Sequence, residues 1–422
     1  MTHPQDLLLD TFRAALASVN PLQILPPHLP DPPAGRTLVV GGGKAAAAMA
    51  AAAENHWPAD APLSGLVVTR YGHSLPTRRI EVVEASHPLP DGRGEAAAGR
   101  MLELASGLGP DDLLLCLLSG GGSSLLAAPV AGLSLKELRA VTKALLASGA
   151  PIRDINTVRK HLTRFSGGQV AAATKAKVCA LTLSDVVGDD PSDIASGPCA
   201  PDCGTYGDAL TVLQRWRVVA TAAVQRHLES GMAGELLDTP KPGHALFRRV
   251  ENRIIGSARE FLAAAADHLA SKGIPVSNLG EVEYDALRLA HAHAQSARDH
   301  LAKGRPRPHG WLSGGESTVH VANPEGRGGR NSTYLLALGL QLSDVQGLWA
   351  IACDSDGIDG SEDNAGALLG PRSLQFLTSH PEQGTRLLTE NRAYEFFQAI
   401  DALVVTGPTR TNVNDFRLLL LT

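Results

Sequence analysis

Leu38-Val39-Val40-Gly41-Gly42-Gly43-Lys44 is a short apolar run that stops at three glycines and a lysine. Five later apolar runs stop in the same way, at glycine and reactive polar residues; they end at Leu118, Leu183, Leu312, Ala352 and Val405. In an open α/β sheet, ligands bind outside the carboxyl ends of the strands. Glycine loops with a lysine suit a phosphate, and clusters of aspartate suit Mg²⁺. We therefore expect an α/β fold with its active site at these strand ends.

The length and net charge of the chain limit the classes of protein to which it can belong. With 422 residues it is too long for one typical core, so we expect two domains. The net charge is -5 and no long basic run occurs, so nucleic acid is not an expected partner. No apolar run approaches the roughly 20 residues that span a bilayer, and no signal peptide is recognisable. We expect a soluble, cytoplasmic protein with no membrane partner.

Cysteine and histidine give little sign of a transition-metal site. Cys199 and Cys203 form a single Cys-x-x-x-Cys, which is weak evidence for zinc without a second pair or a nearby histidine. A disulfide framework is not expected in a chain of this size and type. His291 and His293 lie two apart on an expected helix over residues 284–302, so they face different directions. We expect both to be solvated surface residues.

Two α/β domains follow from the order of the apolar segments. In the first half, continuous apolar runs alternate with helical segments, which indicates a doubly wound parallel sheet covered on both faces. The Pro-Gly stretch at residues 239–244 is the best candidate boundary. A strand over residues 253–256 and a helix over residues 258–269 then begin the second half. Further helix is expected over residues 156–175 and further strand over residues 317–321.

The first glycine turn has the features of an anion site. Gly41, Gly42 and Gly43 let the backbone approach an anion, and the helix that follows adds free N–H groups and a partial positive charge. Lys44 lies in the first helical turn, where the helix dipole disfavours a cation, which suggests that it meets an anion. The alternative is a tight turn with an exposed lysine. Neither the Walker spacing nor a full G-x-G-x-x-G is present, so an NAD site is poorly supported.

A second glycine loop follows the buried run that ends at Leu118. It consists of Ser119, Gly120, Gly121, Gly122, Ser123 and Ser124. Ser123 and Ser124 could cap the next helix and also bind an anion. Capping alone is a common role for such serines, but three glycines are more than a cap needs.

Aspartates crowd the loop after the run that ends at Leu183. Asp185, Asp189, Asp190 and Asp193 would repel one another unless a cation or a basic partner compensates them. Mg²⁺ held by one or two carboxylates and phosphate oxygens is the natural occupant. The alternative is a set of aspartates that form turns and cap helices.

The second half carries a basic turn and another acidic strand end. Arg327 and Arg330 flank two glycines before an expected helix, and a guanidinium can grip carboxylate or phosphate with two hydrogen bonds. Asp354, Asp356 and Asp359 follow a later strand, where one of them could accept a proton from an alcohol or fix a metal ion. Together these groups suit phosphoryl transfer to a small anionic alcohol, which depends mostly on positioning and charge neutralisation.

These motifs resemble the glycerate 2-kinase family over nearly the whole chain. In the first half the resemblance rests on residues 39–45, 119–123, 156–160 and 183–190. In the second half it rests on residues 314–318, 326–331, 356–360 and 411–415, which resemble the MOFRL domain of that family. The resemblance implies a Rossmann-like domain over residues 1–243, an α/β MOFRL domain over residues 244–422 and an active site in the cleft between them. It also implies ATP-dependent phosphorylation of D-glycerate at its 2-hydroxyl, giving 2-phosphoglycerate and ADP.

The resemblance also assigns residues. Lys44, Arg330 and Asp356 match positions in the family's active site, and Asp190 lies in its acidic loop. We expect Lys44 and Arg330 to neutralise the moving phosphoryl group or the glycerate carboxylate, and Asp356 to orient or deprotonate the hydroxyl. The other expected contacts to substrate or phosphate are Gly42, Gly43, Ser119, Gly120, Gly121, Gly122, Ser123, Ser124, Glu316, Asn331 and Asn414.

The expected cofactors are ATP and Mg²⁺, with Asp189 and Asp193 as candidate metal ligands beside Asp190. D-glycerate and the nucleotide are the expected partners, and a homodimer is left open. The chain departs from the family pattern at three notable positions: Ser166 and Gln169 replace basic residues, and Arg410 replaces glycine. Two other functions remain as alternatives, an NAD(P)H-dependent hydroxypyruvate reductase and a non-catalytic protein that binds nucleotides or sugar acids.

Overall fold

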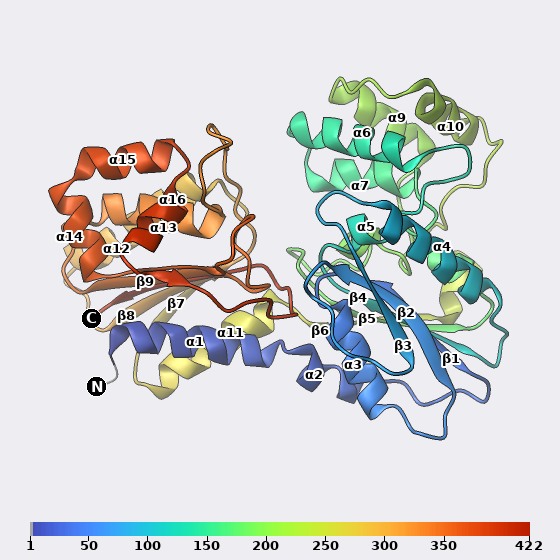
Figure 1. The fold of residues 1–422 in the computed structure, drawn as a ribbon, viewed down its shortest axis with the longest axis horizontal. Coiled ribbons are helices and arrows are strands. Elements are labelled where there is room, and N and C mark those ends of the chain that lie inside the picture. The colour runs from blue at the N-terminus through green and yellow to red at the C-terminus, as the bar shows by residue number, and fades with distance from the viewer. Residues whose placement is uncertain (1–2) are drawn as a thin grey trace. The chain divides into compact units, whose positions relative to one another are not determined.

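The computed structural model describes residues 3–422, which fold into two compact units (Figure 1). One unit is Pro21–Ile255 and is called the N-terminal unit here. The other, the C-terminal unit, combines Gly256–Thr422 with the described residues up to Asn20. No helix among residues 3–422 is long and apolar enough to cross a bilayer.

The N-terminal unit is built on a six-stranded sheet. Its strands are β1 (Thr37–Gly42), β2 (Leu63–Arg70), β3 (Ile80–Ala85), β4 (Leu113–Leu118), β5 (Lys177–Leu183) and β6 (Val250–Gly256). Its α-helices are α2 (Pro21–Ile24), α3 (Ala46–His56), α4 (Gly92–Ser106), α5 (Gly122–Leu125), α6 (Leu135–Ala147), α7 (Ile152–Lys160), α8 (Gln169–Ala172), α9 (Tyr206–Arg215) and α10 (Ala222–Met232). Three short 3₁₀ turns are η1 (Pro26–His28), η2 (Ile194–Ser196) and η3 (Ala245–Arg249).

This sheet confirms the predicted doubly wound α/β fold. Its order is β3-β2-β1-β4-β5-β6, and the pairs from β3 through β5 are parallel. β1 and β4 are buried along their whole length, because both faces of the sheet are covered by helices. Leu38 and Val40 pack into the same core cluster as Met101 of α4. Parallel pairing brings the ends of β1, β4 and β5, with their polar loops, to one edge.

A helical cluster accompanies this sheet. Helices α6, α7, α9 and α10 gather together in the N-terminal unit (Figure 1). They share a small core that includes Leu145, Val158, Leu213 and Leu228, all buried. The cluster fixes the position of α7, which carries Asn156 on its polar face.

The C-terminal unit has a second six-stranded sheet. Its strands are β7 (Val276–Glu281), β8 (His309–Gly314), β9 (Leu348–Asp354), β10 (Gly366–Leu369), β11 (Leu403–Val404) and β12 (Asp415–Leu421). Its helices are α1 (Pro4–Ser18), α11 (Ala258–Ser271), α12 (Ala286–Ala302), α13 (Arg330–Gln341), α14 (Pro371–Ser379), α15 (Pro381–Thr389) and α16 (Ala393–Ala399).

The order of this sheet is β11-β10-β9-β12-β8-β7, and its pairing is mixed. β12 runs antiparallel to both β8 and β9, with Asp415 opposite Asp354 and Arg417 opposite Ser313. The carboxyl ends of β8 and β9 therefore meet the amino end of β12 at the same edge of the sheet. Three polar segments that are distant in sequence become neighbours in this way.

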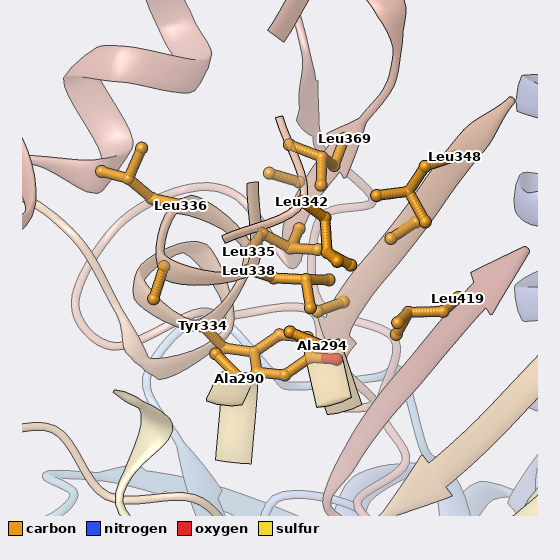
Figure 2. Close-up of a cluster of buried hydrophobic side chains, with 14 of the residues drawn as sticks. Ala290, Ala294, Tyr334, Leu335, Leu336, Leu338, Leu342, Leu348, Leu369 and Leu419 are labelled. Atoms are coloured by element: carbon orange, nitrogen blue, oxygen red, sulfur yellow. The ribbon is translucent and has the colours of Figure 1, made fainter. Parts of the chain in front are cut away.

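Two helical layers cover this sheet. Helices α12 to α16 lie on one face and α1 with α11 on the other (Figure 1). Figure 2 shows the core under the first layer, where leucines of α13 meet Leu348, Leu369 and Leu419 from the strands. On the other face, the rings of Phe12, Phe261 and Phe416 lie 5.3–6.3 Å apart, centroid to centroid. This aromatic contact explains why α1 belongs to the C-terminal unit.

The observed division differs from the expected boundary between residues 243 and 244. The Pro-Gly stretch is tied into the N-terminal unit, since the Asp202 N–H donates to the Pro240 carbonyl and the Thr239 hydroxyl to the Asp202 carboxylate, at 3.0 and 2.9 Å. The expected helix over residues 156–175 is also interrupted: α7 ends at Lys160 and α8 spans Gln169–Ala172, with Gly167 and Gly168 at φ of 61° and 80° just before α8. The expected strand over residues 317–321 is wrong; only Thr318 forms an isolated bridge there.

The expectation that both histidines of α12 face solvent is right for His291 and wrong for His293. His293 is 4% exposed, and its Nδ1 lies 2.7 Å from the Tyr334 hydroxyl. Burial, with a contribution from the charge of Arg417, lowers the pKa of His293 to about 3. The buried imidazole is therefore neutral, and protonating it works against the folded state.

His293 should make stability depend on pH. Between about pH 3 and the ordinary histidine pKa of about 6.5, the unfolded chain binds a proton that the folded protein does not, so stability falls as the pH falls. Wild type should lose about 2 kcal/mol more than His293→Gln between pH 7 and pH 5. Urea unfolding at both pH values measures this. An equal loss in the two proteins would mean that His293 is protonated in the fold.

Candidate functional site

The glycine turn after β1 is hydrogen-bonded to the glycine loop after β4. The Lys44 N–H donates to the Gly120 carbonyl at 2.9 Å, and the Ala45 N–H donates to the Ser119 hydroxyl at 3.0 Å. Gly43 donates to the Val68 carbonyl at 3.1 Å. These three N–H groups, which the sequence suggested for anion binding, are thus paired within the protein. These amides are therefore not open to a ligand.

Close packing at this edge requires glycine. A Cβ on Gly43 would lie 2.1 Å from the Ser119 hydroxyl oxygen, and Gly43 has φ of 140°. A Cβ on Gly122 would lie 2.7 Å from the Cβ of Ala195 and 3.0 Å from the Gly42 carbonyl oxygen. The turn after β1, the loop after β4 and the η2 segment are therefore packed backbone against backbone.

The Ser119–Ser124 loop retains the features of an anion cradle. Among residues 3–422, the N–H groups of Gly120 and Gly121 donate to no protein acceptor. Gly121 has φ of 82°, and a Cβ built on it would lie 3.0 Å from the His87 ring and 3.4 Å from Cγ of Lys44. The open amides thus lie beside the lysine. His87, which follows β3, lies in no motif and was not expected here.

A hydrogen-bonded chain links this loop to α7. The Ser123 and Ser196 hydroxyl oxygens lie 2.7 Å apart, and Ser196 donates to the Asn156 carboxamide oxygen at 3.1 Å. Ala195 and Ser196 have φ of 51° and 60°, a conformation that side chains disfavour and that often marks functional sites. The Ser124 hydroxyl donates to the Gly121 carbonyl, so Ser124 stabilises the loop itself.

The acidic loop after β5 is partly explained by turns. An Asp190 carboxylate oxygen accepts from the Ser192 N–H at 2.8 Å, and the Asp193 N–H donates to the Asp190 carbonyl at 3.0 Å. Asp190 is exposed, whereas Asp189 and Asp193 are half-buried. Within residues 3–422, no group of three or more His, Cys, Asp or Glu residues is placed to hold a metal ion. The oxygen donors of Asp189 and Asp193 fit Mg²⁺ that takes one or two carboxylates and its other ligands from substrate and water.

At the C-terminal edge, Arg330 is surrounded by carboxylates. Its Nε donates to Asp415 at 2.8 Å, and its two terminal nitrogens donate to Glu316 at 2.6 Å and Asp354 at 2.7 Å. Burial alone would lower the Arg330 pKa, but the charges of these three carboxylates raise it well above its ordinary value. Asp354 and Asp415 are buried, while the Glu316 side chain is half exposed.

Asp415 pairs with a second arginine as well. Arg417 is fully buried; its guanidinium donates to Asp415 and, at 2.9 Å, to the Gly314 carbonyl. Burial would raise the Asp415 pKa, but Arg330 and Arg417 outweigh it and lower that pKa. Asn331 adds a hydrogen bond to Asp415 at 2.8 Å. Asp415 ends the motif at residues 411–415, but neither Asp415 nor Arg417 was expected in the site, although two charges at alternate positions of an apolar strand were a usable signal.

The start of α13 is held by another buried aspartate. The Asp359 carboxylate accepts from the N–H groups of Asn331 and Ser332, both at 2.9 Å, which satisfies free donors at the helix N-terminus. A Cβ on Gly329 would lie 2.2 Å from the same carboxylate. Asp359 therefore positions Arg330 rather than facing a ligand.

Asp356 lies in the turn after β9. It is 1% exposed; one of its carboxylate oxygens accepts from the Ile358 N–H at 2.8 Å, and its N–H donates to Asp354 at 3.0 Å. Asn414 has φ of 67°, and its carbonyl accepts from the Ser355 N–H at 3.0 Å. Glu316, Arg330, Asn331, Asp356 and Asn414 thus come to one edge of the C-terminal sheet. Gly42, Gly43, Lys44 and residues 119–124 come to one edge of the N-terminal sheet.

Gly43→Ala should be strongly destabilising, because the new methyl group collides with Ser119. We expect a loss of more than about 3 kcal/mol in the free energy of unfolding. Gly132→Ala is the control, since Gly132 has φ of 85° but an added Cβ would meet nothing within 4 Å, so only strain of about 1 kcal/mol applies. Equal losses in urea unfolding would show that packing of the two loops does not matter.

Asp415→Asn should leave Arg330 and Arg417 without their shared buried partner. Breaking a buried ion pair from one side costs about 3–5 kcal/mol. Asp344→Asn is the matched control, because Asp344 pairs with Arg298 on the surface and its loss costs less than about 1 kcal/mol. Thermal unfolding of both variants measures the difference, and similar melting temperatures would contradict this role of Asp415.

Fold and geometry together define a two-domain α/β protein, with glycine loops at the edge of a doubly wound sheet and an arginine–carboxylate cluster at the edge of a mixed sheet. Residues 7–229 match the "Domain of unknown function (DUF4147)", and residues 309–415 match the "MOFRL family". The D-glycerate 2-kinase of Thermotoga maritima is 38% identical over 356 residues, covering 83% of this chain and 82% of that protein.

Solved structures agree with this likeness. The crystal structure of the Thermotoga maritima glycerate kinase matches with a TM-score of 0.85 at 36% identity, over 99% of each chain.

A protein of Agrobacterium vitis, provisionally named a hydroxypyruvate reductase, is 46% identical over 422 residues, covering 99% of this chain and 94% of that protein. This chain belongs to the glycerate 2-kinase family, in which a DUF4147 domain precedes a MOFRL domain.

Proposed function

We propose that this protein transfers the γ-phosphoryl group of ATP to the 2-hydroxyl of D-glycerate, giving 2-phosphoglycerate and ADP. The observation that carries the proposal is the placement of Lys44 beside the open amides of Gly120 and Gly121 at the edge of the N-terminal sheet. The identity to the Thermotoga maritima D-glycerate 2-kinase supports the choice of substrates.

The N-terminal edge supplies positive charge and hydrogen-bond donors. In phosphoryl transfer, negative charge is spread over the oxygens of the moving group, so fixed donors and cations lower the barrier. Lys44 would neutralise part of that charge, and the amides of Gly120 and Gly121 would hold phosphoryl oxygens. Asp189 and Asp193 would hold Mg²⁺, which when bound adds positive charge to the phosphate oxygens.

The C-terminal edge would serve the acceptor. The oxygen of the 2-hydroxyl forms the new bond to the γ-phosphorus, the bond to the bridging oxygen of ADP breaks, and the hydroxyl proton passes to the Asp356 carboxylate. The Ile358 N–H fixes the orientation of that carboxylate. Arg330 already has three carboxylate partners, of which half-exposed Glu316 is the one that a substrate anion could replace.

Hydroxypyruvate reduction is the second candidate, because the Agrobacterium vitis relative carries that name. Such a reaction needs NAD(P)H. The turn after β1 has Ala46 at the third glycine position of the G-x-G-x-x-G pattern, and its amides at Gly43, Lys44 and Ala45 are paired within the protein. Loss of nicotinamide absorbance with hydroxypyruvate would favour this second function over the kinase.

Replacing Lys44 or the Asp356 carboxylate tests the proposal. In a coupled assay with ATP, Mg²⁺ and D-glycerate, Lys44→Ala and Asp356→Asn should each lower kcat/KM by about 10²–10³-fold, as expected for a lost charge partner or proton acceptor. Lys136→Ala, at an exposed position of α6, should stay within about twofold.

Circular dichroism and thermal unfolding would show that the variants keep the fold. Wild type with no nucleotide-dependent turnover on D-glycerate would refute the proposal. An unchanged rate in one variant would remove that residue from the site.

A further inference from the structure

Arg159, in the last turn of α7, is a half-buried cation that the proposed reaction has not used. Across residues 3–422, its guanidinium forms no hydrogen bond and no ion pair. Its neighbour Lys160 contrasts with it, because Lys160 Nζ lies 3.3 Å from the buried Asp202 carboxylate. Two adjacent cations on one helix thus differ: Lys160 has a carboxylate partner, and Arg159 has none within the described part of the chain.

A charged group that is partly removed from water needs compensation. Burial lowers the pKa of Arg159 to about 10, and no neighbouring carboxylate offsets this loss. Arg159 is still protonated at neutral pH, so the folded protein carries the cost of a desolvated positive charge. Proteins tolerate such a cost where a ligand of opposite charge supplies the missing partner.

The position of Arg159 relates it to the glycine loop. Asn156 lies three residues earlier on α7, so the two side chains share one face of the helix. Asn156 accepts from Ser196, which in turn contacts Ser123 of the Ser119–Ser124 loop, at 3.1 and 2.7 Å. The polar face of α7 is therefore coupled to the loop with open amides at Gly120 and Gly121. The left-handed backbone at Ser196 holds the middle of this chain in place.

We propose that Arg159 binds an oxyanion of the substrates at this edge of the N-terminal sheet. The planar guanidinium matches a group with two oxygens and a negative charge, which both a carboxylate and a phosphoryl group provide. In the proposed kinase reaction, on which this assignment of the ligand rests, the oxyanion is either the carboxylate of D-glycerate or a phosphoryl group of the nucleotide. Arg159 is then a substrate-binding residue.

Steady-state kinetics with each substrate varied separates the two sources. Arg159→Gln should raise the KM of the ligand that it holds by about 10- to 100-fold, as for a lost hydrogen bond to a charged group. A rise for D-glycerate alone identifies the carboxylate, and a rise for ATP identifies the phosphoryl group. Arg159→Lys keeps the charge but loses the planar fork, so its KM should lie between those of wild type and Arg159→Gln.

Arg153→Gln is the matched control, since Arg153 is exposed on the same helix, and its kinetics should stay within twofold of wild type. A purely structural role predicts another pattern, a lower melting temperature with unchanged KM values. Removing an uncompensated charge should instead leave the melting temperature of Arg159→Gln equal to or above that of wild type. KM values and kcat within twofold of wild type for Arg159→Gln would overturn the proposal.

Calorimetric titration keeps this test separate from the kinase proposal. Inorganic phosphate, ADP and D-glycerate are titrated into wild type and Arg159→Gln without turnover. At least tenfold weaker binding of one probe to the variant supports the role of Arg159, even if wild type shows no kinase activity. Equal binding of all three probes to both proteins, or no binding of any of them to wild type, refutes it.

Discussion

The Asp415 carboxylate, fully buried at the start of β12, accepts hydrogen bonds from Arg330 and Arg417 at once. It can do so because β12 is inserted antiparallel between β8 and β9, with Asp415 opposite Asp354. The same carboxylate binds the side chain of Asn331 and so connects the sheet to the first turn of α13. Without this shared partner, Arg417 would lose the carboxylate that compensates its buried charge, and Arg330 would keep only Glu316 and Asp354.

The residues at the two sheet edges are held in place by different interactions. The N-terminal edge relies on glycine, because the turn at Gly43 and the loop at Ser119 approach more closely than any side chain permits. The C-terminal edge relies on paired charges instead, with carboxylates in excess over Arg330 and Arg417. A neutral, tightly packed backbone holds the loop beside the side chain of Lys44. Ion pairing with Arg330 and Arg417 at the second edge lowers the pKa of the buried Asp415 carboxyl.

Local patterns predicted the first sheet well. The apolar runs before Gly41, Ser119 and Ser184 are strands because each is buried on both faces, and parallel pairing then brings their ends together. The second edge was predictable only in part. Arg330, Asp356 and Asp415 all lie in recognised motifs, but the pairing of Asp415 with Arg330 depends on the antiparallel register of β12, which no local pattern specifies. His293 was misjudged for a similar reason, since its partner Tyr334 comes from another helix.

The arginines of this chain show how charge compensation separates structural from functional groups. Arg417 has its partners within the protein and is fully buried, which is the arrangement that a permanent part of the fold requires. Arg330 has three carboxylates, one of which, Glu316, is half exposed. Arg159 has no partner among the described residues and lies on the polar face of α7. Arg159 has the least compensation of the three arginines, and the oxyanion proposed above would supply the partner that the protein does not.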